Sequence, residues 1–233
     1  MKKSLLALAG AFLGLCPGGV RAQQPGIIRR FESSTVLLAS GDTLHGPLDF
    51  YLAQDIVRIV LPDQTMSTLS AVAVQSFAVQ GEQEPTIGSF RALVRAEPVN
   101  PARVRVFRTY LWNHDNDYSD FRSPAFFEQL SSGPRVLLRR EVLVTRSSPY
   151  GYGPYGMNGG MSSTYSDIQD KFYLATPTGA VLPLRNPKKD LPAAFGSLGR
   201  QIEQYARERK LSYTDAGELA LLVNYANSLS TPK

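Results

Sequence analysis

Short apolar runs separated by turn residues dominate the first part of the chain. Val36 to Leu38 is followed by the turn Gly41-Asp42 and by a second run from Thr43, which Gly46-Pro47 then interrupts. Such runs between Gly, Pro and Asp predict short strands joined by tight turns. Because Pro47 cannot donate a ladder hydrogen bond, we expect an edge, a bend or a bulge at this point.

The same pattern continues to about residue 80 and predicts about five strands in all. Repeated short strands with a glycine-containing bend are typical of a small SH3-like barrel or a strongly twisted meander, which we expect over residues 35–80. Residues 23–34 contain Pro25-Gly26 and the pair Arg29-Arg30, and we expect them to form a short lead-in.

A second antiparallel sheet region is expected over residues 86–185. Val104 to Arg108 alternates, and we expect valine and phenylalanine on one face and arginine on the other. Phe126 to Leu130 and Val136 to Val144 flank Ser-Ser-Gly-Pro and predict a hairpin. Residues 147–166 are rich in Tyr, Gly, Ser and Pro with almost no aliphatic residue, which predicts a flexible loop between two strands.

The hydrophobic period changes from 2 to about 3.6 residues after Asn186. The apolar stripes predict short helices over residues 186–230 that cover one sheet face, with Ser212 and Asp215 as a capping-box pair before the last of them. The whole pattern predicts an α+β fold that is mostly β: a small barrel or meander, a second antiparallel region and a C-terminal helical cap.

The N-terminus has the three parts of a secretory signal peptide, expected at residues 1–22. Lys2 and Lys3 precede an apolar run from Leu5 to Leu15, and Val20-Arg21-Ala22 offers small residues for cleavage. Lipidation at Cys16 is the alternative. We therefore expect an exported protein of the periplasm or outer cell surface, with no transmembrane segment after cleavage.

Removal of this segment would change the charge and cysteine content. Loss of Lys2, Lys3 and Arg21 lowers the net charge from +5 to +2, so the sequence does not favour a nucleic-acid-binding protein. The single cysteine also leaves, which removes any disulfide or thiol nucleophile from the remaining chain.

Catalytic signatures are scarce. The chain has neither a G-x-S-x-G elbow nor a phosphate-cradling glycine motif, and it has only two histidines. These observations argue against the common enzyme classes without excluding every enzyme, and we expect no cofactor. The pairs Arg139-Arg140 and Lys188-Lys189 are interpreted as solvated charges near strand and helix ends.

The densest polar cluster runs from residue 114 to residue 120. Asp115, Asp117 and Ser119 occupy alternate positions, as the oxygen ligands of a calcium loop do. The match fails at the sixth and twelfth positions, where Asp120 and Phe126 replace Gly and Glu. A metal site and a solvated loop at the tip of a hairpin are both consistent with this cluster.

Aromatic residues give a second candidate site. Tyr150, Tyr152 and Tyr155, together with Trp112, could stack on sugar faces or contact a partner. The alternative is an insertion with no specific ligand.

The chain resembles a group of uncharacterised secreted proteins from Gram-negative bacteria. The resemblance rests on the Gly-Asp-Thr-Leu turn at Gly41 to Leu44, on Tyr173-Leu174, on the Lys-Lys-Asp-Leu helix start at Lys188 to Leu191, and on Tyr225 to Asn227. It implies an exported protein with this architecture and carries no activity.

Three functions follow as hypotheses. The first is a non-catalytic envelope protein that binds or scaffolds an envelope protein or cell-surface polymer. The second is a glycan or small-ligand binding module that uses the loop tyrosines. The third is a metal-dependent hydrolase that uses the 114–120 cluster.

Overall fold

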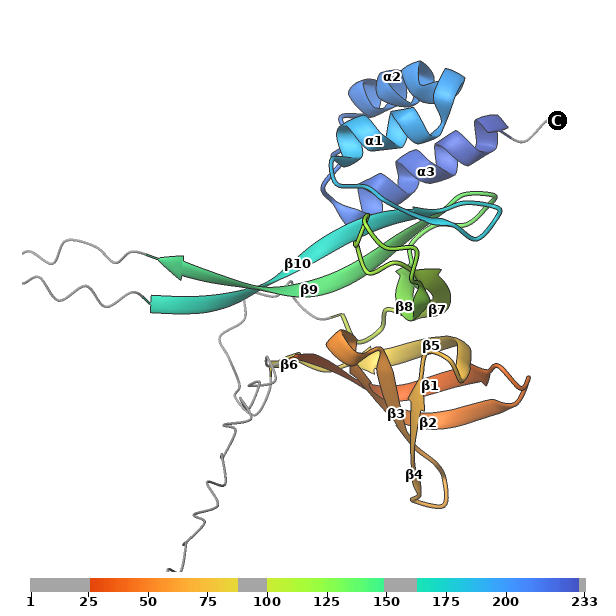
Figure 1. Ribbon diagram of the computed structural model, residues 1–233, viewed down its shortest axis with the longest axis vertical. Coiled ribbons are helices and arrows are strands. Elements are labelled where there is room, and N and C mark those ends of the chain that lie inside the picture. The colour runs from red at the N-terminus through yellow and green to blue at the C-terminus, as the bar shows by residue number, and fades with distance from the viewer. Residues whose placement is uncertain (1–25, 88–99, 149–162, 231–233) are drawn as a thin grey trace, which may run out of the picture.

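The computed structural model describes residues 26–87, 100–148 and 163–230, which form one antiparallel sheet and a helical cap (Figure 1). The strands are β1 (Ile27–Leu38), β2 (Thr43–Tyr51), β3 (Ile56–Val60), β4 (Met66–Ser70), β5 (Val74–Glu82), β6 (Thr86–Ile87), β7 (Arg105–Trp112), β8 (Ser123–Gln129), β9 (Val136–Ser148), β10 (Ser163–Ala175) and β11 (Val181–Pro183). The helices are α1 (Pro187–Ala194), α2 (Gly199–Arg209) and α3 (Ala216–Ser230), with short 3-10 turns η1 (Leu52–Gln54) and η2 (Gly196–Leu198). The α+β, mostly β fold is confirmed, and the predicted signal peptide lies outside the described residues.

The two β regions expected from the sequence form a single sheet. Its order is β11-β10-β9-β8-β7-β5-β1-β2-β3-β4, with β6 paired to β1. The pairing of Ser76 with Arg108 and of Val79 with Arg105 joins β5 to β7 and makes the sheet continuous. Among the described strands β4 does not pair with β5, so the first part is a curled, open meander.

The first strand starts earlier than expected, at Ile27, inside the proposed lead-in. β1 pairs with both β2 and β5, and a register shift between Phe31 and Ser34 marks a bulge opposite Pro47, next to the Ser34–Gly46 pair. The Ser34 hydroxyl donates a hydrogen bond of 2.7 Å to the Gly46 carbonyl. The expected irregularity at Gly46-Pro47 is therefore confirmed as a bulge-associated bend that lets the sheet curl.

The core of the curled sheet is aromatic. Phe50, Phe77, Phe107 and Phe126 come from four different strands and are each at most 4% exposed. Phe77 and Phe107 stack at 4.8 Å between ring centroids, and Phe50 meets Phe126 edge to face at 5.6 Å. Such pairs add to the area that the rings bury, so this cluster holds β2, β5, β7 and β8 together.

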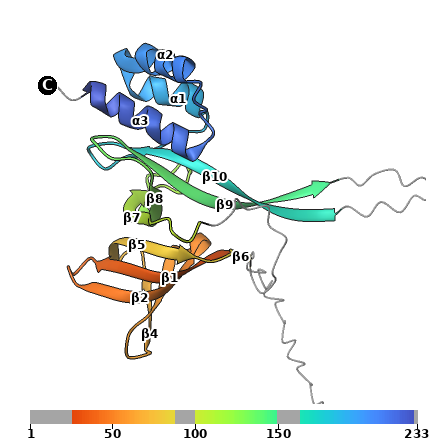
Figure 2. The same cartoon turned by 180° about the vertical axis from the view of Figure 1, so that it is seen from behind.

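The β9–β10 hairpin connects the N-terminal strands to the helices. Three cross-strand pairs follow one another along one face of this hairpin. Leu137 and Leu174 pack against the helical cap, and Leu143 and Ile168 pack against the aromatic core. The charged pair Glu141–Asp170 lies between them. Figures 1 and 2 show the hairpin passing beneath the helices and extending past the rest of the sheet. The expected loop over residues 147–166 begins and ends inside these strands, and residues 149–162 lie outside the described part.

The helical cap covers one sheet face, as the sequence predicts. Ile202 of α2 and Leu219 of α3 are fully buried against strand residues such as Leu174. The predicted capping pair is wrong in one respect: the Asp215 carboxylate accepts the backbone N–H of Glu218, so Asp215 caps α3. No helix in the described residues is both long and apolar enough to cross a membrane.

Candidate functional site

A cleft of about 800 Å³ lies beside the helical cap. Lys171 and Tyr173 of β10 line it from the sheet, and Arg185 and Thr214 line it from the segments before α1 and α3. Asp115, from the loop between β7 and β8, completes the lining. Acidic, basic and apolar groups thus surround one concave space, as is typical of ligand sites.

The loop between β7 and β8 is held against this cleft by charged contacts. His114 and Asp115 have left-handed backbone conformations, with φ of 57° and 59°, which turn the chain back after β7. Asp115 Oδ2 accepts hydrogen bonds of 2.9 Å from both Lys171 Nζ and the Tyr173 hydroxyl. Burial and the neighbouring Asp115 carboxylate raise the pKa of Tyr173, so its hydroxyl remains a donor.

Two aromatic side chains of the same loop point into solvent. Tyr118 is fully exposed and Phe121 is 70% exposed. Asp117, next to Tyr118, pairs with Arg185 at the cleft. The braced loop therefore presents exposed aromatic rings at low ordering cost.

The side chains proposed as metal ligands each have other partners. Asp115 pairs with Lys171, Asp117 pairs with Arg185, and Ser119 Oγ accepts the backbone N–H of Phe121. No group of three or more His, Cys, Asp or Glu side chains placed to hold a metal ion occurs within residues 26–87, 100–148 and 163–230. The structure therefore brings only Asp115 to the cleft, and the metal site stays a prediction.

Of the aromatic candidates, the structure describes only Trp112. Trp112 is 9% exposed, and its ring packs against Arg140 at 4.6 Å and His114 at 4.5 Å. It belongs to a buried cluster and is not presented to solvent. Tyr150, Tyr152 and Tyr155 lie outside the described residues, so their proposed role stays a prediction.

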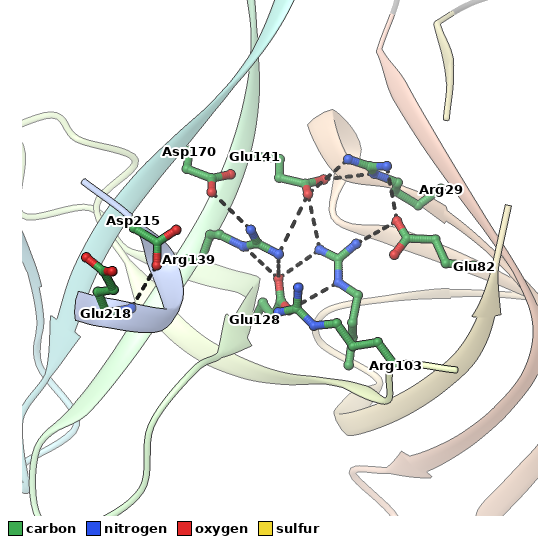
Figure 3. A network of polar contacts seen from close by, with 10 residues as sticks. Arg29, Glu82, Arg103, Glu128, Arg139, Glu141, Asp170, Asp215 and Glu218 are labelled. Atoms are coloured by element: carbon green, nitrogen blue, oxygen red, sulfur yellow. Dashed lines mark hydrogen bonds and ion pairs between the residues drawn. The ribbon is translucent and has the colours of Figure 1, made fainter. Parts of the chain in front are cut away.

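A buried network of ion pairs lies between the cleft and the N-terminal strands (Figure 3). It joins four arginines and four carboxylates: Arg29, Arg103, Arg105, Arg139, Glu82, Glu128, Glu141 and Asp170. Glu128, which is 2% exposed, accepts from Arg105 at 2.7 Å and from Arg139 at 2.6 Å. Arg103 and Asp170 lie at its more exposed edges, and the equal numbers of positive and negative groups offset part of the desolvation that burial imposes.

The network connects the two parts of the chain to the cleft. Arg29 in β1 binds Glu141 in β9, 112 residues later, through two hydrogen bonds of 2.9 and 3.0 Å. At the other side Arg139 donates to Asp170, which also lines the cleft.

Sequence interpretation missed these residues. Arg105 and Phe107 are two positions apart on β7, so they share the buried face, whereas Val104 is 57% exposed. The expected division into apolar and arginine faces is therefore wrong. Arg139, expected as a solvated charge, is 6% exposed. The sequence does contain one signal for this network: in several strands an arginine or a glutamate occupies the same face as large apolar residues.

Arg140, also expected in solvent, bonds a backbone group of β8 that is not paired with β9. β8 and β9 pair only at Glu128 and Gln129. Beyond that point Arg140 donates to the Phe126 carbonyl at 2.7 Å and Asp55 accepts the Phe126 N–H at 2.8 Å. Arg140 and Asp55 also pair with each other at 2.8 Å, which satisfies the polar groups where the strands diverge.

Glu141 gives the network a pH dependence. Burial raises its pKa, but Arg105, Arg29 and Arg139 outweigh this effect and lower the pKa from 4.5 to about 2. Because the folded state has the lower pKa, the stabilisation is complete above pH 4.5 and is lost as the pH falls toward 2. Asp170 opposes this change, since burial outweighs Arg139 and raises its pKa.

We therefore expect the urea midpoint to fall as the pH is lowered from about 5 to 2.5. Glu141→Gln, which cannot titrate, should flatten this fall while lowering the midpoint at pH 7. A wild-type midpoint that is constant over this range would contradict the coupling.

A histidine and a serine also meet near the loop. His114 Nε2 lies 2.5 Å from Ser123 Oγ. Nucleophilic catalysis also needs a group that orients the histidine. Among the described residues no carboxylate bonds to its other ring nitrogen. The contact therefore braces the loop without completing a triad.

Comparison with known proteins finds no matching family model, no similar curated protein and no similar solved structure. Inference about function therefore rests on the sequence and the site.

Proposed function

We propose that the protein is an exported, non-catalytic binding module of the cell envelope and that the cleft holds its ligand or partner. The cleft itself carries the proposal, because a concave space with apolar walls and convergent charges is the usual form of a binding site. The signal-peptide pattern of residues 1–22 supports export.

The polar groups of the cleft are suited to recognition. Lys171 and Arg185 are 50% and 62% exposed in their side chains, and each pairs with one aspartate. Exposed pairs contribute little to stability, so either cation can exchange its partner for a ligand at small cost. The sheet and loop hold both groups in place before binding, which reduces the entropy that binding must overcome.

Retention of an envelope component by the immobilised protein tests this function. The chain without residues 1–22 is exposed to a mild-detergent extract of the native host's envelope, and bound material is identified. We expect one defined protein or polymer to be retained, and Lys171→Gln with Arg185→Gln to reduce retention about tenfold because two charged contacts are lost.

A matched control separates this effect from a change of net charge. Lys189→Gln with Arg200→Gln removes the same charge from exposed positions that do not line the cleft. Its retention should equal that of the wild type. Equal losses in both double variants, or turnover of the retained material, would contradict the proposal.

A further inference from the structure

A second cleft, of about 650 Å³, lies on the helical cap and meets the first. Thr214 lines both clefts, and the consecutive residues Pro187 and Lys188 line one each. The two spaces are therefore neighbours along the start of α1 and the segment before α3.

The second cleft is cationic. Lys188, Arg207 and Lys210 line it, with Glu203 as the one acidic residue, which gives the lining a net charge of +2. Within the described residues none of these three cations forms an ion pair. The interior arginines of the same structure behave differently, because each is paired with carboxylates (Figure 3).

The position of Lys188 is not explained by helix stability. Arg207 and Lys210 lie at the end of α2, where cations interact favourably with the helix dipole. Lys188 and Lys189 both lie in the first turn of α1, where the same dipole disfavours a cation, and of the two only Lys188 lines the cleft. An anion in the cleft would offset this cost, because it would pair with Lys188 and with Arg207 and Lys210, which line the same cleft.

We propose that the two clefts form one groove for an acidic polysaccharide, whose carboxylate or phosphate groups occupy the cationic part. The proposal rests on the proposed binding function and names its ligand class. Ser212, Tyr213 and Thr214 also line the groove and carry hydroxyl groups, which suit the hydroxyls of a sugar chain. The hydroxyls of Ser212 and Thr214 bond each other at 2.9 Å, and each can form a further hydrogen bond. The lining of the first cleft is balanced, with Lys171 and Arg185 beside Asp115 and Asp170, so the charged groups of the ligand are expected in the second cleft.

The test uses three dextrans with one backbone: carboxymethyl-dextran, phosphorylated dextran and unmodified dextran. Binding to the chain without residues 1–22 is measured by calorimetry at low and at physiological salt. We expect one or both charged dextrans to bind, more weakly at higher salt, and unmodified dextran not to bind. Preference between the two charged forms identifies which anionic group is recognised.

Two triple variants locate the site. Lys188→Gln, Arg207→Gln and Lys210→Gln together should lower the affinity for the charged dextran at least about tenfold. Lys189→Gln, Arg200→Gln and Arg209→Gln remove the same charge from the same helices but do not line the groove, and should leave the affinity unchanged. All six residues are exposed, and the melting temperature checks that both variants fold.

Equal losses in the two triple variants, or no binding of either charged dextran, would overturn the proposal. If an envelope component is still retained in that case, the binding function stands and only the ligand class is wrong. If nothing is retained, both proposals fail.

Discussion

Glu128→Ala should lower the free energy of unfolding by about 3–5 kcal/mol, because the network would then hold four arginines against the three carboxylates Glu82, Glu141 and Asp170. The Glu128 side chain accepts hydrogen bonds from Arg103, Arg105 and Arg139. Arg105 and Arg139 are 4% and 6% exposed, so water cannot replace the lost carboxylate. Their uncompensated charge would favour an opened sheet.

Urea unfolding at pH 7 measures this effect, with Glu84→Ala as the control. Glu84 is exposed and forms no ion pair among the described residues, so its removal should change stability by less than about 0.5 kcal/mol. A loss below about 1 kcal/mol for Glu128→Ala would show that the network is solvated in solution.

Gly46→Ala should destabilise the fold by about 3 kcal/mol or more, through strain and displacement of β3. Gly46 has a φ of 154°, and a Cβ at this position would lie 1.9 Å from the Val60 carbonyl oxygen. The obstacle is backbone, which cannot rotate away. Either the bend in β2 or the position of Val60 in β3 would therefore have to change.

Gly41→Ala provides the comparison for Gly46→Ala. Gly41 also has a positive φ, of 94°, but no atom lies within 4 Å of an added Cβ. Its substitution should cost only about 1 kcal/mol, from backbone conformation alone. Thermal unfolding of both variants isolates the steric part, and equal losses would show that β3 moves freely.

Local pattern predicted the elements of this fold well because most strands and helices are specified by neighbouring residues. The turn at Gly41-Asp42, the hairpin around Gly133 and the helical period after Asn186 each depend on a few consecutive side chains. The joining of the two β regions could not be predicted in this way. It depends on β5 and β7, which are separated by residues 83–104 and have no shared local signal.

The candidate site was less accessible to sequence reasoning for the same reason. Asp115 was noted for its neighbours in the chain, but its partner Lys171 is 56 residues away. Arg105 and Arg139 resemble surface arginines until the strand register shows that both face Glu128. Strand alternation predicts which residues share a face, but not whether that face is buried.

The contact between Arg29 and Glu141 has a consequence for synthesis. The chain is made from its N-terminus, so β1 to β5 leave the ribosome before Glu128 and Glu141 have been translated. Until then Arg29 has only Glu82 among its network partners, and the ring of Phe77 lacks Phe107 and Phe126. The nascent N-terminal half therefore remains incompletely packed, and the compact state is reached only after β9 is available.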